Sequence, residues 1–210
     1  LRLAAPPRAA KPVTYAATAG WAAVLGVFLQ LTGSVPLAWW LPCMVAAIAW
    51  LYLYLWGTRE MNLLEAGYSC ARAFILAELA ASVEWQLHCA LLPHRGGGDG
   101  LALLLLVVVD GVLYGTVFWL ERRRPSPAGK LTVSNKAALV AVVMAAMVFA
   151  VSNLLFLGDG EVNMSIYYIR TLVDFCGVLI LTIQHDQLRE SALHSELEAM
   201  DEVLHRQYEQ

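Results

Sequence analysis

Charged side chains are scarce in this 210-residue sequence: they make up 15% of the residues, whereas 59% are hydrophobic. Soluble domains usually carry about 25% charged and about 45–50% apolar residues, so this composition argues against an ordinary soluble domain and favours a membrane protein. The net charge is only −3, and the basic residues cluster in loops instead of forming a binding face. Nucleic acid is therefore not expected as a partner.

Paired cysteines are also missing. The chain has four cysteines, Cys43, Cys70, Cys89 and Cys176, and each lies in an apolar stretch with no CxxC spacing. We therefore expect neither a disulfide framework nor a metal site, and we interpret all four as small buried hydrophobic side chains.

Long apolar runs are what the sequence has instead. A transmembrane helix needs about 20 mostly apolar residues to cross about 30 Å of hydrocarbon. Six windows meet this requirement, at 13–31, 36–56, 66–92, 101–120, 137–157 and 165–184. The third is the weakest, because Arg72, Glu78, Glu84 and His88 interrupt it. These windows predict an all-α fold, with a six-span transmembrane bundle over 1–184 and a cytoplasmic helix over 185–210.

The basic residues orient the predicted bundle. Cytoplasmic loops of membrane proteins are enriched in Lys and Arg. If the N-terminus is placed inside, the outer loops hold a single basic residue, Arg95. The inner segments then hold eleven basic residues: Arg2, Arg8, Lys11, Arg59, Arg122, Arg123, Arg124, Lys130, Lys136, Arg189 and Arg206. This asymmetry predicts that both termini are cytoplasmic.

The segment after the sixth window contains neither glycine nor proline and is rich in helix-forming residues. Leu193, Leu197, Met200 and Leu204 recur at spacings of four, three and four, which is the a/d stripe of a coiled coil. We therefore predict a helix that pairs two copies of the chain. The alternative is a helix that caps the bundle or lies on the membrane surface, but its acidic character suits an anionic surface poorly.

Charged residues inside the predicted spans need partners, because each costs about 2.5–3.5 kcal/mol at bilayer depth. Glu84 and His88 are four residues apart in the third span, as are Arg170 and Asp174 in the sixth, and the two pairs lie at similar depth. We therefore predict a cluster of these four side chains in the outer leaflet. It is either a ligand or signal site coupled to the cytoplasmic helix, or a network that only fixes helix packing.

Other polar residues carry weaker signals. Arg72 and Glu78 are six residues apart and do not share a helical face. Asp110 with Gly111 is interpreted as a helix-packing notch. No nucleotide site follows the three histidines of the cytoplasmic helix, so they are interpreted as solvated side chains: His185, His194 and His205. The sequence starts with Leu1 and stops inside a helical pattern, so we expect a longer parent protein.

Three segments resemble a known family: GYSCARAFILAELAASVEWQLHC, IYYIRTLVDFCGVLIL and ELEAMDEVLHRQYEQ. Together, over about 62–210, they look like the membrane sensor region of bacterial GHKL-type sensor histidine kinases. In that family several spans lead through a short coiled coil to a dimerisation helix with a phosphoacceptor motif, followed by an ATP-binding domain. Neither of these last two parts is present here, so no catalytic residue is carried over.

The resemblance implies a multi-pass protein of the bacterial plasma membrane that acts in a two-component system. Its partners would be a second copy of the chain, bound through the C-terminal helix, and a cognate response regulator, bound through the kinase domain. Some six-span relatives sense secreted peptides, so an extracellular peptide is one expected ligand. ATP and magnesium would belong only to the kinase domain, and this chain itself is expected to hold no cofactor.

The sequence therefore favours a signal-input module that transmits a ligand or membrane signal through the sixth span. One alternative is a small six-span transporter, or the substrate-binding component of one, because charged residues near the midplane also suit transport. Another is a non-catalytic membrane scaffold whose cytoplasmic helix only dimerises.

Overall fold

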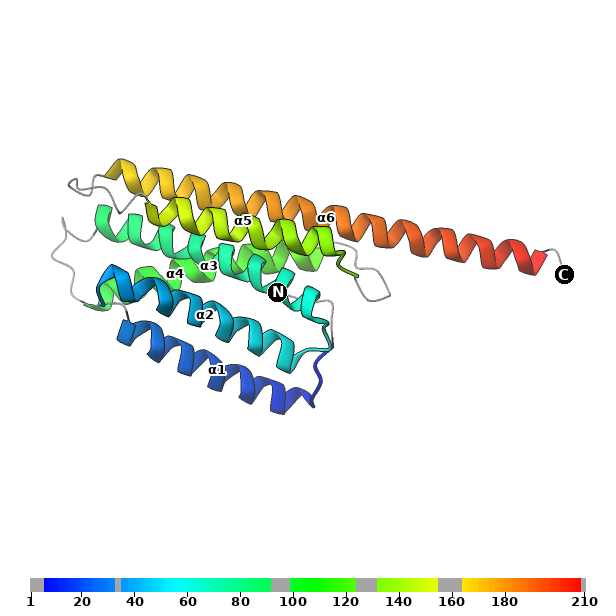
Figure 1. Ribbon diagram of the computed structural model, residues 1–210, viewed down its shortest axis with the longest axis horizontal. Helices are drawn as coiled ribbons and strands as arrows, with labels where there is room; N and C mark the ends of the chain where they lie inside the picture. The colour runs from blue at the N-terminus through cyan, green and yellow to red at the C-terminus, as the bar shows by residue number, and fades with distance from the viewer. Residues whose placement is uncertain (1–5, 33–34, 92–98, 124–131, 155–163, 209–210) are drawn as a thin grey trace.

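The computed structural model describes residues 6–32, 35–91, 99–123, 132–154 and 164–208, and every element in these ranges is an α-helix (Figure 1). The helices are α1 (Lys11–Thr32), α2 (Leu37–Thr58), α3 (Leu63–Leu91), α4 (Asp99–Arg123), α5 (Asn135–Leu154) and α6 (Met164–Tyr208). The predicted all-α fold is confirmed for these residues.

Each predicted span coincides with one helix, although the boundaries differ. α6 does not end near residue 184 but continues unbroken to Tyr208. Residue 92 of the third span and residues 155–157 of the fifth lie outside the described ranges, as do Arg95 and the ends of the chain.

Five helices are long and apolar enough to cross a membrane by length and composition. These stretches are Pro12–Thr32, Trp39–Thr58, Gly100–Arg123, Asn135–Asn153 and Ser165–Tyr208. The remaining predicted span, α3, does not meet these criteria, because its 29 residues include Glu65, Arg72, Glu78 and Glu84.

α3 lies at the centre of the fold. It contacts α2, α4, α5 and α6, whereas α1 contacts only α2 within the described ranges. Twelve residues of α3 are buried. Among them, Phe74 and Ile75 pack with Ala141, Val148 and Leu181 in the largest buried apolar cluster of the chain. The one helix among the six described that does not meet the span criteria is therefore also the one most enclosed by its neighbours.

Helices α3, α5 and α6 approach one another closely at Gly177. A Cβ atom at this position would lie 2.8 Å from Val148 Cγ2 and 3.2 Å from Ile75 Cγ2. Only glycine leaves room for these two side chains, so Gly177 sets how tightly α6 packs against the core.

Two helix starts are fixed by side-chain caps. The backbone N–H of Glu65 donates to Asn62 Oδ1 at 2.8 Å, and the backbone N–H of Asn62 donates to Glu65 Oε2 at 3.0 Å. This reciprocal capping box defines the start of α3. Ser134 caps α5 by accepting from the backbone N–H of Ala137 at 3.2 Å.

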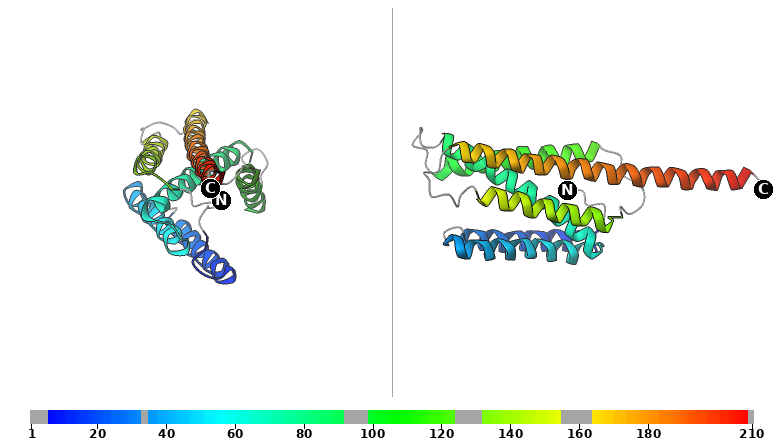
Figure 2. Two further views of the ribbon diagram at one scale, coloured as in Figure 1. Left: turned by 90° about the vertical axis from the view of Figure 1, so that its right-hand side faces the viewer. Right: turned by 45° about the horizontal axis from the view of Figure 1, so that its top comes forward.

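The last part of α6 extends well beyond the ends of the other helices (Figures 1 and 2). Leu197, Met200 and Leu204 are exposed on this arm, at 63%, 64% and 49%, and Leu193 is half-buried. The arm is thus a helix with an uncovered apolar stripe, and its pairing into a coiled coil stays a prediction.

Candidate functional site

Asp174 of α6 is the most enclosed charged side chain of the bundle, with no exposed surface. Ser152 Oγ of α5 donates to its Oδ1 at 2.7 Å, and the Ser82 hydroxyl of α3 donates to its Oδ2. Both serines are themselves buried. One carboxylate therefore joins three helices through hydrogen bonds to both of its oxygens.

Arg170 lies one turn earlier on α6 and connects this carboxylate to a second one. Its Nη2 donates to Glu78 Oε2 at 3.0 Å, and its Nε lies 3.9 Å from Asp174 Oδ2. Thr171 adds a further bond to α3, because its Oγ1 donates to Gln86 Oε1 at 3.1 Å. We call the five residues Glu78, Ser82, Ser152, Arg170 and Asp174 the polar cluster.

The polar cluster combines two carboxylates with one guanidinium. Buried charges are tolerated when they are paired and hydrogen-bonded, and each charge of the cluster has such a contact. Hydrogen bonds to ionised groups are short and directional, so the cluster fixes the rotation of α6 relative to α3 and α5. Among the residues that the structure describes, no group of three His, Cys, Asp or Glu side chains is arranged to hold a metal ion.

The structure divides the four residues that were predicted to form one cluster. Arg170 and Asp174 lie together, but Glu84 and His88 form a separate pair, with 3.9 Å between His88 Nδ1 and Glu84 Oε1. Each residue turns a helix by about 100°, so Glu84 lies roughly 200° around α3 from Ser82. The carboxylate that pairs with Arg170 at 3.0 Å is instead Glu78.

Sequence reasoning placed Glu78 apart from this site and did not select Ser82 or Ser152. Glu78 and Ser82 are four residues apart, on the same side of α3 as the buried Ile75. That spacing was the signal that could have identified them. Ser152 is a single hydroxyl in an apolar helix, and the sequence holds no local signal for its role.

Arg72 takes a partner from another helix, as does Glu78. Its Nη2 donates to Glu121 Oε1 of α4 at 3.0 Å, and both side chains are largely buried. Asp110 lies half-buried on α4, but a Cβ on Gly111 would meet nothing within 4 Å. The prediction of a packing notch at these two residues is therefore wrong, because no helix of the described ranges approaches α4 at Gly111.

Two further expectations change. His185 was interpreted as solvated, yet it is only 8% exposed and stacks on Tyr68 with 6.0 Å between ring centroids. The reason is that α6 continues past residue 184 without a break, so His185 still packs against Tyr68 of α3. His194 and His205 are exposed as expected. Of the cysteines, Cys70 is buried and Cys43 and Cys89 are half-buried, but Cys176 is exposed. The prediction of four buried thiols is therefore wrong for Cys176, because an apolar window does not fix which face of its helix is covered by a neighbour.

Comparisons of this chain with protein-family models, with curated proteins and with solved structures found no match.

Proposed function

We propose that this chain is the signal-input part of a membrane-bound sensor histidine kinase, with six membrane crossings and both ends in the cytoplasm. The observation that carries the proposal is the form of α6. One uninterrupted helix of 45 residues holds Arg170 and Asp174 near its start and the exposed stripe of Leu197, Met200 and Leu204 near its end.

A sixth crossing by α3 is consistent with its length and its surroundings. A helix of 29 residues is about 43 Å long, which exceeds the hydrocarbon thickness. Charged residues in transmembrane helices usually face the bundle interior and pair there. Arg72 and Glu78 follow this pattern, because each is bound to a residue of a surrounding helix.

The polar cluster is the proposed point at which a signal acts on α6. A ligand or membrane signal that changes the packing of α3 against α5 also moves Asp174 and Arg170, since they are bonded to both helices. A rigid helix passes a rotation or a shift along its whole length. The arm then delivers this movement to a paired arm of a second chain and so to a kinase domain.

The first test is the gene sequence beyond codon 210. We expect a phosphoacceptor motif followed by an ATP-binding domain. A stop codon close to codon 210, or an unrelated module, would overturn the kinase proposal and leave transport or scaffolding as the function to test.

The second test addresses coupling in the full-length protein, reconstituted in nanodiscs with ATP. Asp174→Asn should change the autophosphorylation rate several-fold, because it alters the hydrogen bonds that set the rotation of α6. Asp110→Asn is the matched control, since α4 makes no contact with α6 within the described ranges. Equal rates for wild type and Asp174→Asn would contradict coupling through the polar cluster.

A further inference from the structure

The charges of the polar cluster do not balance. Glu78 and Asp174 are two carboxylates, and among the described residues Arg170 is the one cation paired with them. With all three groups ionised, the polar cluster carries one excess negative charge. Glu78 is only 6% exposed and Asp174 is fully buried. Because a buried charge without a counter-charge is strongly disfavoured, the polar cluster needs one further positive charge.

The other helices do not supply this charge. Arg170 and Asp174 of α6 act most strongly on Glu78, and α5 faces the polar cluster with the neutral Ser152 hydroxyl. On α3 itself, Arg72 and Glu84 each lie six residues from Glu78, about 9 Å along the helix, and each has a partner elsewhere. Further ionisable side chains of α2, α4 and α5 are not bonded to the polar cluster: Cys43, Tyr52, Tyr54, Asp110, Tyr114, Glu121, Arg122, Arg123 and Lys136.

One carboxylate oxygen of the polar cluster has no hydrogen-bond donor. Both oxygens of Asp174 accept from serines, and Glu78 Oε2 accepts from Arg170. Glu78 Oε1 accepts no hydrogen bond from the described residues. A neutral carboxyl group explains this arrangement, because its carbonyl oxygen accepts from Arg170 while its second oxygen carries the proton. Glu78, rather than Asp174, is therefore suited to hold a proton.

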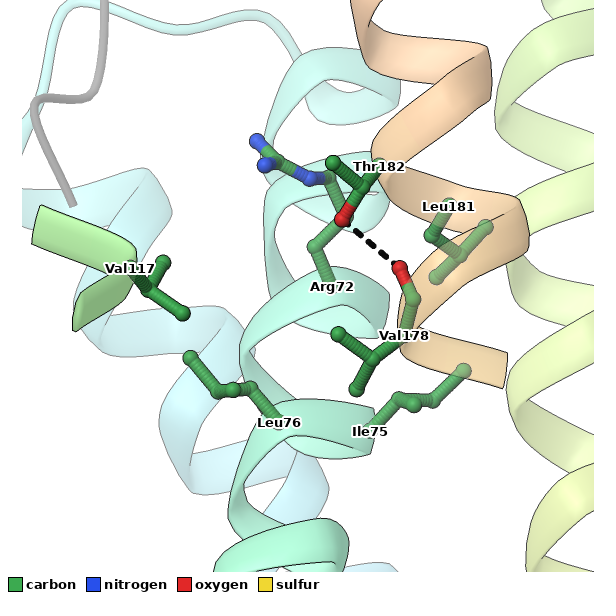
Figure 3. A pocket seen from close by; sticks show the side chains of 7 residues that line it. All are labelled: Arg72, Ile75, Leu76, Val117, Val178, Leu181 and Thr182. Atoms are coloured by element: carbon green, nitrogen blue, oxygen red, sulfur yellow. Dashed lines mark hydrogen bonds between the residues drawn. The ribbon is translucent and has the colours of Figure 1, made fainter. Parts of the chain in front are cut away.

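The space beside the polar cluster also favours a very small ligand. One turn of α6 beyond Asp174, a pocket between α3, α4 and α6 has a volume of about 30 Å³, which is room for about one water molecule. Figure 3 shows Arg72 and Thr182 toward one end of this pocket and Leu76 and Ile75 toward the other. A proton needs no cavity of its own, whereas an organic ligand does not fit in this pocket.

We propose that Glu78 binds one proton and that this proton makes the contact between α3 and α6 sensitive to pH. The proton comes from water and forms a bond to Oε1, which leaves the polar cluster neutral. When the proton leaves, ionised Glu78 competes with Asp174 for Arg170 and draws the guanidinium toward α3. The inference rests on the role of the polar cluster in the proposed function, but not on the kinase.

Infrared spectroscopy of the full chain in phosphatidylcholine nanodiscs tests for the proton directly. At about pH 7 exposed carboxyl groups are ionised. Wild type should therefore show the C=O stretch of a buried protonated carboxyl, and this band should shift on exchange into D₂O. Glu78→Gln should lose the band, whereas the control Glu84→Gln should keep it, because Glu84 is paired with His88 outside the polar cluster. Absence of the band in wild type, or its persistence in Glu78→Gln, would overturn the proposal.

Asp174→Asn tests the charge balance by another route and decides the question if Glu78→Gln does not fold. This variant leaves one carboxylate for one guanidinium. Glu78 should then stay ionised, so the band should vanish although Glu78 itself is unchanged. A band that persists in Asp174→Asn would show that the second carboxylate does not cause the protonation of Glu78, and the proposal would be wrong.

The melting temperature shows whether the proton acts on the fold. The folded chain holds a proton that an ordinary glutamate of the unfolded chain releases above about pH 5, so linkage requires the stability to fall as pH rises. Between about pH 6 and about pH 9, the melting temperature should fall more for wild type and Glu84→Gln than for Glu78→Gln. The same pH dependence in all three proteins would contradict the proposal.

A sodium ion would also supply the missing positive charge, so melting in sodium chloride is compared with melting in choline chloride at equal ionic strength. We expect equal melting temperatures for wild type in the two salts. A rise in sodium chloride that Glu78→Gln abolishes would assign the site to a metal ion and overturn the proton proposal. None of these measurements involves phosphorylation, so failure here is distinguishable from failure of the kinase proposal.

Discussion

Asp174 shows how much of the helix packing depends on single buried side chains. Its two oxygens accept from Ser82 and Ser152 on two other helices. In Asp174→Asn an amide N–H₂ group replaces one of these acceptors and faces a hydroxyl and the guanidinium of Arg170. We expect the free energy of unfolding to fall by about 2 kcal/mol, the range for hydrogen bonds to a charged group.

Unfolding of this variant is best followed by circular dichroism in mixed micelles. Asp201→Asn is the control, because Asp201 is exposed on the arm. Unchanged stability of Asp174→Asn would mean that the polar cluster does not hold α3, α5 and α6 together.

Gly177 gives a second prediction about a single position. In Gly177→Ala the new methyl group lies 2.8 Å from Val148 Cγ2. The helices must separate, so we expect a loss of about 1–3 kcal/mol in the free energy of unfolding. Gly111→Ala meets no neighbour within 4 Å, and there the better helix propensity of alanine should stabilise by up to about 1 kcal/mol. Equal effects at both glycines would contradict the tight packing at Gly177.

At the scale of single residues, the sequence predicted part of the polar cluster. The pair of Arg170 and Asp174 follows from their spacing on one helix and is present in the structure. Depth along the helix favoured Glu84 over Glu78, but the choice depends on which face of α3 meets α6. That face is set by tertiary contacts, such as the packing of Ile75 against Gly177, and not by the local sequence.

At the scale of secondary-structure elements, hydropathy predicted the position of every described helix but not where each helix ends. Each of the six predicted windows contains a helix, because an apolar run of about 20 residues can satisfy its backbone hydrogen bonds without water only as a helix. The end of the sixth window at residue 184 marks only a change in polarity. No proline interrupts 164–208, so the backbone continues as a helix while its surroundings change.

The arm carries a prediction of its own. If Leu197, Met200 and Leu204 form the seam between two chains, Leu197→Cys in a cysteine-free background should form a disulfide-linked dimer on mild oxidation in membranes. Glu198→Cys lies about 100° further around the helix and should cross-link much more slowly. The measurement is the dimer band on a non-reducing gel. Similar rates at both positions would contradict a specific seam and favour an arm that stays unpaired.

For the whole molecule, the sequence does not predict that the other helices are arranged around α3. Composition indicates a helical membrane protein, but it does not reveal that the weakest span is the central one. The structure gives the physical reason: Arg72 and Glu78, two of the charged residues that lower the hydropathy of α3, are bound to α4 and α6 inside the bundle. Low hydropathy and central position therefore have the same cause.

This central helix decides the topology of the chain through a parity argument. If α3 crosses the bilayer, there are six crossings and both ends lie on the same side. If α3 does not cross, the five remaining helices place the ends on opposite sides. Single cysteines introduced at Ala9 and at Tyr208, in a background without native cysteines, can be labelled in intact cells with a membrane-impermeant maleimide.

We expect both positions to be protected in intact cells and labelled after lysis, because the basic residues favour cytoplasmic ends. A cysteine at Gly100, at the start of α4, should instead be labelled from outside. Labelling of Ala9→Cys but not of Tyr208→Cys in intact cells would mean that α3 turns back without crossing. The polar cluster would then lie at one membrane surface, and α6 would connect that surface, not the bilayer interior, to the arm.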